Sequence, residues 1–163
     1  MSDPVEQVQE LVSALDYPMF IVTVTDGTEK SGCLIGFATQ CSIDPPRFLV
    51  CISDKNHTYG VVQRADVVVV HLVPAEADEL AELFGSQTGD DIDKFSRCAW
   101  HEGPAGTPVL DECENWFAGR ILERVDAGDH CALLLDPFDA HAGTGERPFT
   151  VHRARRLEPG HEA

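Results

Sequence analysis

The chain has 163 residues, of which 43% are hydrophobic and 25% are charged, so it has the composition of an ordinary globular protein and is long enough to bury a core. Its net charge of −16 argues against nucleic acid and anionic membrane surfaces as partners, because both are bound through lysine and arginine. No apolar run approaches the roughly 20 residues of a membrane-spanning helix, and the acidic N-terminal segment does not resemble a signal peptide. We therefore expect one cytoplasmic domain over residues 1–163.

The first half of the chain predicts one helix followed mainly by strands. Residues 3–15 form the helical pattern: Asp3 can cap it, Pro4 suits its first turn, and apolar residues recur at helical spacing. Asp26-Gly27 is a hairpin turn signal. The other elements expected in this half are strands over 19–25, 30–38, 47–53 and 67–73, and a short helix over 58–64.

The second half predicts two helices, a loop and further short strands. The expected elements are a helix from Pro74 to Gly85, a short helix over 90–95, a loop over 101–106, strands over 115–125, 130–137 and 149–152, and a disordered tail over 158–163. Strands do not alternate regularly with helices. This pattern favours a mainly β fold, an antiparallel barrel with peripheral helices, over a doubly wound parallel sheet.

A proline corner follows the second expected strand. It reads Ser42-Ile43-Asp44-Pro45-Pro46, in which neither proline can donate a ladder hydrogen bond and Pro46 holds Pro45 in an extended conformation. We expect the backbone amides of residues 38–42, just before the corner, to face something other than a neighbouring strand. A flat heteroaromatic ligand or its phosphate would suit such a surface.

The chain lacks the common motifs of catalysis by its own side chains. It has no G-x-S-x-G elbow, no Walker A loop and no G-x-G-x-x-G, and His101-Glu102 lacks the second histidine of a zinc protease motif. The six cysteines form no C-x-x-C pair and no cysteine–histidine cluster at zinc spacing, so we predict structural thiols and no metal site. An enzyme built on this sequence would need a cofactor that brings its own reactivity.

Three features together resemble the flavin reductase-like family, the FMN-binding split barrels. They are the Ser-x-Asp-Pro-Pro corner, the polar cluster over residues 53–58 one strand later, and Gly128-Asp129-His130 between two further strands. The resemblance covers about residues 10–157. It implies an antiparallel split β-barrel, a homodimer with FMN near the subunit interface (FAD being an alternative), and hydride transfer from NADH or NADPH to the flavin. It also implies that reduced flavin could supply a partner monooxygenase.

The resemblance also implies which residues contact the ligands. The relatives' flavin-contacting segment corresponds to Gly36, Phe37, Ala38, Thr39, Gln40, Cys41 and Ser42, although its usual T-A-N-S is here Leu34-Ile35-Gly36-Phe37. The phosphate grip corresponds to Ser53, Lys55, Asn56, His57 and Thr58. His130 is the expected catalytic residue, which orients the pyridine nucleotide or protonates reduced flavin, and Phe95 is expected to shape the pocket.

Two alternatives remain open at this point. The altered T-A-N-S segment favours a flavin-binding protein without reductase turnover, such as a sensor or carrier. An oxidoreductase that uses a deazaflavin is the other, because related barrels accept that ring.

Overall fold

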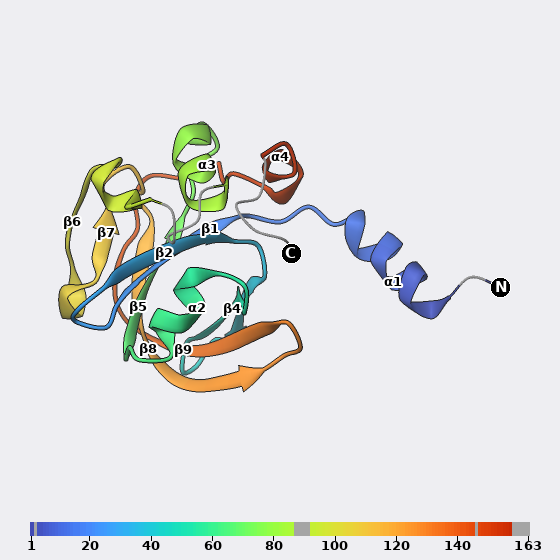
Figure 1. Ribbon diagram of the computed structural model, residues 1–163, viewed down its shortest axis with the longest axis horizontal. Coiled ribbons are helices and arrows are strands. Elements are labelled where there is room, and N and C mark those ends of the chain that lie inside the picture. Colours follow the sequence, from blue (N-terminus) through green and yellow to red (C-terminus); the bar gives the residue numbers. More distant parts are fainter. Residues whose placement is uncertain (2, 87–91, 146, 158–163) are drawn as a thin grey trace.

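The computed structural model describes residues 1, 3–86, 92–145 and 147–157, and its centre is a seven-stranded antiparallel sheet (Figure 1). The strand order is β2-β1-β5-β8-β9-β4-β3. This arrangement confirms the expected mainly β fold with few helices. The seven strands are β1 (Phe20–Thr25), β2 (Lys30–Ile35), β3 (Ala38–Ser42), β4 (Arg47–Ser53), β5 (Val67–Leu72), β8 (Trp116–Asp126) and β9 (His130–His141).

Short helices and a second hairpin lie around this sheet. The hairpin is formed by β6 (Trp100–Glu102) and β7 (Pro108–Leu110), with a 3-10 turn over Pro104–Gly106 between them. Another 3-10 turn covers Lys94–Ser96. The helices are α1 (Pro4–Ser13), α2 (His57–Val62), α3 (Asp78–Ser86) and α4 (Val151–Ala154). Among the described residues, no helix has both the length and the apolar character needed to cross a bilayer.

The valine run of β5 is buried because both faces of the sheet are covered there. Val68 and Val70 belong to the main core cluster, which also contains residues of β1, β4 and β9. Val69 points the other way and packs with Val109 of β7 and Ala118 of β8. A strand covered on both faces favours apolar residues on both of its sides, so the four valines of β5 do not alternate with polar residues.

The two end strands of the sheet are β2 and β3, and the sheet curls so that β2 also contacts β4. The outer edge of β2 is capped by Lys94, which is 4% exposed. Its Nζ donates to the carbonyls of Gly32 (3.1 Å) and of Phe84 (3.2 Å), near the C-terminus of α3. A cation at a helix C-terminus is favourable, and here it also satisfies an edge carbonyl that has no partner strand.

His71 joins the sheet to the β6–β7 hairpin from inside the core. Its side chain is fully buried; Nδ1 lies 2.9 Å from the carbonyl of Ile21, and Nε2 accepts the amide of Leu110 at 3.0 Å. Accepting at Nε2 requires a neutral ring that donates through Nδ1. Burial therefore lowers the pKa of His71 from 6.5 to about 4.

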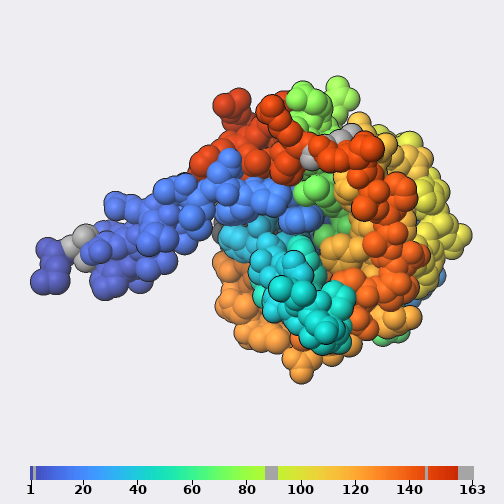
Figure 2. Space-filling view, turned by 180° about the vertical axis from the view of Figure 1, so that it is seen from behind, coloured from blue at the N-terminus to red at the C-terminus, as the bar shows by residue number. Residues whose placement is uncertain are grey.

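Helix α1 projects from the body of the protein (Figures 1 and 2). Asp3 caps it by accepting the amide of Val5, as expected from the sequence. None of its residues is buried, and its apolar side chains share one face while remaining 46% to 64% exposed: Val5, Val8, Leu11 and Val12. The apolar face of α1 is therefore exposed to solvent.

Residues 38–42 form a strand, which corrects one prediction. The expected strand over 30–38 ends at Ile35, and Ala38–Ser42 is the separate edge strand β3, paired antiparallel with β4. The turn over residues 43–46 folds β3 back along β4 as a hairpin. Because β3 is an edge strand, alternate amides of this segment face β4 and the others face away from it, so the expectation is wrong only for those on the β4 side.

Other predicted elements also differ from the structure. Residues 101–106 are not a plain loop, because they include β6 and a 3-10 turn. The expected strand over 149–152 runs into α4 and keeps only an isolated bridge between Thr150 and Pro18. The expected helix over 90–95 is a 3-10 turn from Lys94, with residues 90–91 outside the described residues. The tail over 158–163 also lies outside them.

Candidate functional site

A cavity of about 260 Å³ opens where β2, β4 and β9 meet the C-terminal helix. It brings together five of the residues predicted from the sequence: Gly36, Phe37, Ser53, Asn56 and His130. Its remaining lining residues are Tyr17, Met19, Cys33, Leu34, Ile35, Cys51 and Val151. The walls are thus mostly apolar, with polar groups grouped at the β4 and β9 side.

Strand register explains why residues far apart in the sequence meet here. In the β4–β9 ladder Ser53 lies opposite His130 and Cys51 opposite Ala132. The link between β2 and β3 crosses the same region, because the carbonyl of Phe37 accepts the amide of Cys51 at 2.8 Å. A sheet that pairs distant strands therefore assembles the site.

The floor of the cavity is uncharged. Burial raises the pKa of the Cys33 thiol to about 11, and it also raises the pKa of Cys51. Both thiols are therefore neutral at physiological pH and act as small apolar groups. Ile35, which lies on the same side of β2 as Cys33, adds a further apolar residue to this uncharged lining.

Gly36 is required by the protein's own packing. A Cβ atom on it would lie 2.8 Å from Cε2 of Tyr17 and 3.1 Å from Sδ of Met19. A glycine in the predicted flavin-contacting segment could let the backbone approach a ligand ring closely. The structure instead places the aromatic ring of Tyr17 against Gly36, and both residues line the cavity.

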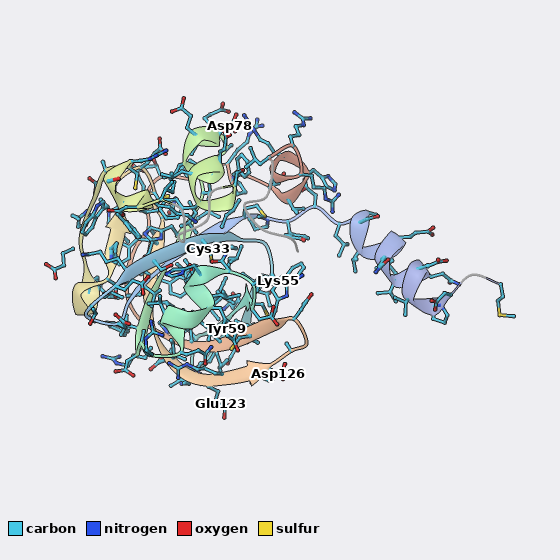
Figure 3. All side chains as sticks on the ribbon, in the orientation of Figure 1. Cys33, Lys55, Tyr59, Asp78, Glu123 and Asp126 are labelled. Atoms are coloured by element: carbon cyan, nitrogen blue, oxygen red, sulfur yellow. The ribbon has the colours of Figure 1, made fainter. Side chains whose placement is uncertain are left out.

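His130 stands at the junction of two cavities. Its Nδ1 lies 2.6 Å from Oδ1 of Asp129, and because a carboxylate can only accept, Nδ1 carries the proton in this contact. The hydrogen bond to His130 lowers the pKa of Asp129. The second cavity, of about 310 Å³, is polar and is lined by Asp54, Tyr59, Gln63, Arg124, Asp126, Gly128, His130 and Cys131. Figure 3 labels Tyr59 on α2 and Asp126 at the end of β8, two of the elements that frame it.

The predicted phosphate segment forms a tight turn into α2. Ser53 Oγ accepts the amide of Lys55 at 3.3 Å, and Asn56 Oδ1 caps the helix by accepting the amide of Thr58 at 3.0 Å. Nε2 of His57 is in hydrogen-bond contact with a carboxylate oxygen of Glu29. Lys55 is exposed beside this turn, and Coulombic attraction to it helps to lower the pKa of Asp129 (Figure 3).

Thr58 and Phe95 lie in the core, away from the positions expected of them. Thr58 is fully buried, and its hydroxyl lies 2.8 Å from that of Ser31. This corrects the expectation that the Thr58 hydroxyl grips a phosphate, since it does not reach solvent. Phe95 packs edge-on between Phe84 and Trp100 and does not line the cavity.

The β3 residues of the predicted flavin segment also lie outside the cavity. Thr39, Gln40 and Cys41 are exposed on the edge strand, whereas Ala38 and Ser42 are half-buried. Thr39 and Gln40 direct their side chains to backbone carbonyls of the same strand, those of Gln40 and Ser42. Only Gly36 and Phe37 of this segment therefore face the candidate site.

Sequence reasoning missed most of the apolar wall. Tyr17, Met19 and Val151 come from the two ends of the chain and carry no motif that links them to the other residues. Cys51 could have been found, because it lies two residues before Ser53 on the same strand and so faces the same side.

The site is suited to a flat ring with a polar edge. Apolar side chains cover one side of the cavity, while a histidine, a serine and an asparagine stand at its margin. Binding sites for planar cofactors combine these features, because the walls supply burial and the few polar groups fix orientation. The described residues that line this cavity include no carboxylate and no lysine, and burial keeps its two thiols neutral, which fits a site whose reactivity comes from a ligand.

Comparison with known proteins agrees with this geometry. The FMN reductase (NADH) RutF of Bradyrhizobium diazoefficiens is 31% identical over 126 residues, which cover 77% of this chain and 69% of that protein. The reductase component of a 4-nitrophenol 4-monooxygenase/4-nitrocatechol 2-monooxygenase of Rhodococcus opacus is 27% identical over 135 residues, 83% of this chain and 70% of that protein. The solved structure of the NADH:FAD oxidoreductase SgcE6 of Streptomyces globisporus C-1027 matches with a TM-score of 0.82 at 22% identity, over 92% of this chain and 90% of that chain.

The family model described as flavin reductase like domain matches residues 12–160. This range includes the proline corner, the Ser53–Thr58 turn and Gly128-Asp129-His130, the three features that carried the resemblance in the sequence. With nearly the whole chain matched, the chain belongs to the flavin reductase like domain family.

Proposed function

We propose that this protein is a flavin reductase that transfers hydride from NAD(P)H, with NADH as the preferred donor, to FMN. The observation that carries the proposal is the cavity in which Gly36, Phe37, Ser53, Asn56 and His130 meet against an apolar wall. Family membership and the NADH-using FMN reductases among the relatives support it. FAD is an alternative flavin, since the structural relative SgcE6 is an NADH:FAD oxidoreductase.

The residues present fit a flavin. The uncharged lining that includes Cys33, Ile35 and Cys51 suits an isoalloxazine ring, and the exposed side chain of Lys55 beside Ser53 and Asn56 suits its phosphate. When bound, the flavin supplies the two-electron acceptor that the protein's side chains lack. The protein's contribution is to bind the ring, exclude water from its inner side and leave its outer side open to the donor.

His130 is the residue we assign to turnover. Because Asp129 holds the proton on Nδ1, the other ring nitrogen, Nε2, is the one that can exchange a proton with a ligand. The position of His130 at the junction of the apolar and polar cavities suits a contact with both flavin and pyridine nucleotide. Asp129 would fix the orientation of the imidazole in either role.

The proposal extends to a homodimer. The uncovered apolar face of α1 supports it, because a second copy would bury Val5, Val8, Leu11 and Val12. We expect light scattering to give the mass of a dimer for the natural chain and of a monomer for a variant with Val8→Glu and Val12→Glu. The control Glu10→Lys, on the opposite face of α1, should stay dimeric. A dimeric double variant would show that α1 does not form the interface.

We further propose that residues 1–163 form one domain of the split-barrel type and that the protein works in the cytoplasm. The strong curl of the sheet, with β2 in contact with β4, supports a split barrel. A monooxygenase that receives reduced flavin is the proposed partner class, because a similar protein is the reductase component of a 4-nitrophenol 4-monooxygenase/4-nitrocatechol 2-monooxygenase.

The decisive experiment mixes the purified protein with FMN under anaerobic conditions and adds NADH or NADPH in separate samples. Bleaching of the visible flavin band by NADH at a catalytic rate is the expected result. A bound flavin that neither donor bleaches would contradict the proposal and favour a carrier or sensor. Absence of FMN binding would show that Leu34-Ile35-Gly36-Phe37 does not support a flavin site.

A further inference from the structure

Phe37 is an exposed aromatic residue in a position where exposure calls for an explanation. Its side chain lines the apolar cavity, yet the residue is 54% exposed. The ring therefore has one part against the cavity and another in solvent. A large apolar ring at the mouth of a binding cavity is a feature of sites that bind flat ligands.

The backbone that carries Phe37 is held on both sides. Its carbonyl accepts the amide of Cys51 at 2.8 Å, and the carbonyl of Gly36 accepts the amide of Ala38 at 3.1 Å. The link is only two residues long and lies between β2 and β3. The ring thus stands on a fixed base, so its place at the rim is set before a ligand binds.

The imidazole of His130 covers only part of the Phe37 ring. The two ring centroids are 5.0 Å apart, and the planes are tilted by 49°. A tilted contact leaves much of the phenyl face open to a third ring. Phe37 and His130 together therefore form an aromatic rim on the solvent side of the cavity.

The open side of a bound flavin determines which ligand ring would lie next to Phe37 and His130. A flavin seated in the cavity, against the apolar lining that includes Cys33 and Ile35, has its inner side covered, so the donor must approach from the solvent side. Hydride transfer requires the two rings to lie in near-attack contact. The second ring then lies beside Phe37 and His130.

Resting on the proposed function, we propose that Phe37 is a binding residue for the nicotinamide ring of the hydride donor. Its phenyl face stacks on the nicotinamide and thereby sets the affinity for the dinucleotide, with little effect on the affinity for FMN. The oxidised nicotinamide ring is a cation, which the face of an aromatic ring attracts. The contact therefore holds NAD⁺ at least as well as NADH.

The experiment compares three variants of the full-length chain. Phe37→Leu keeps an apolar side chain but removes the aromatic face, Phe37→Tyr keeps the face, and Phe138→Leu is the control, since Phe138 is also exposed but lies on β9 against Arg120. Flavin fluorescence measures the dissociation constant of FMN. Perturbation of the flavin absorbance measures that of NAD⁺ for the FMN-loaded protein, and steady-state assays give KM for NADH and kcat.

We expect Phe37→Leu to weaken NAD⁺ binding and raise KM for NADH by about tenfold, the effect of losing one stacked aromatic contact, while FMN binding changes less than about twofold. Phe37→Tyr and Phe138→Leu should behave like the natural protein. Equal losses of FMN and NAD⁺ affinity would overturn the inference by placing Phe37 on the flavin. So would unchanged binding of both, or a fall in molecular mass that makes Phe37 a subunit contact.

Failure of the proposed function gives a different result. If the natural chain does not reduce FMN, direct titration with NADH followed by its fluorescence still compares the variants. Weaker NADH binding by Phe37→Leu alone would then support the role of Phe37 although the protein is not a reductase. Equal binding by all variants would overturn it.

Discussion

Because His71 is neutral in the folded protein, the free energy of unfolding should decrease as the pH falls below about 6.5. The substitution His71→Gln should remove this part of the pH dependence. The imidazole is fully buried, donates to the carbonyl of Ile21 and accepts the amide of Leu110. Protonation would put a second donor against the Leu110 amide inside the core. The folded protein therefore resists protonation at His71, and desolvation lowers its pKa from 6.5 to about 4.

The sign and size of the effect follow from proton linkage. Above pH 6.5 the ring is neutral in both the folded and the unfolded chain, and the stability is fully present. As the pH falls from 6.5 towards 4, the unfolded chain binds the proton first, so the free energy of unfolding decreases. A pKa lowered from 6.5 to about 4 corresponds to about 3 kcal/mol in total, of which about 2 kcal/mol is lost between pH 7 and pH 5.

Urea unfolding followed by tryptophan fluorescence at pH 7, 6 and 5 measures this loss. The comparison is with His71→Gln, whose amide can also donate and accept but does not titrate. Carboxylates elsewhere titrate equally in both proteins, so the natural chain should lose about 2 kcal/mol more than the variant between pH 7 and pH 5. Parallel pH profiles would refute the reasoning.

A second measurement uses only the natural protein and so does not depend on whether the His71→Gln variant folds. NMR signals of the His71 ring in the natural protein should stay at their neutral positions down to about pH 5, because only about a tenth of the folded molecules are then protonated there. A midpoint near 6.5 for these signals would contradict the buried neutral ring independently of any variant.

Three further predictions concern the site and the packing beneath it. Lys55→Ala should weaken the binding of FMN far more than that of riboflavin, because Lys55 is assigned to the phosphate; equal losses in fluorescence titrations of the two ligands would remove that assignment. His130→Ala should lower kcat for NADH oxidation by about 10²-fold or more while leaving the dissociation constant of FMN nearly unchanged, and unchanged kcat would exclude it from turnover. Gly32→Ala should destabilise the protein by about 1–3 kcal/mol in urea unfolding, since its Cβ would lie 2.8 Å from the ring of Phe84. The control Gly60→Ala, in α2 with open space around its Cβ, should not destabilise; similar losses in both variants would argue against a specific clash.

Much of the fold could be predicted because local patterns and burial agree. The strand over residues 47–53 was predicted with the bounds of β4, and the strand over 67–73 was predicted to within one residue of β5. The last helix could not be found in this way. Residues 149–152 look like a strand in isolation, but Thr150 forms only an isolated bridge with Pro18, and α4 already begins at Val151.

The candidate site, too, could be predicted only in part from the sequence. Ser53 and His130 were singled out by polar motifs at strand ends, and the β4–β9 register does place them opposite each other. Thr58 carried the same kind of signal, but its hydroxyl lies in the core against Ser31. A short motif identifies a turn and its residue types, whereas the direction of each side chain depends on what packs against the turn.

The sequence by itself determined the family, the mainly β fold and the segments that approach the site, because strand patterns and a proline corner are local properties of the chain. Only the tertiary structure decided which side chains share the cavity. Tyr17, Cys33 and Val151 meet Phe37 and His130 there because the sheet curls and the two ends of the chain pack together. Contacts of that kind arise between residues far apart in sequence, and no local pattern records them.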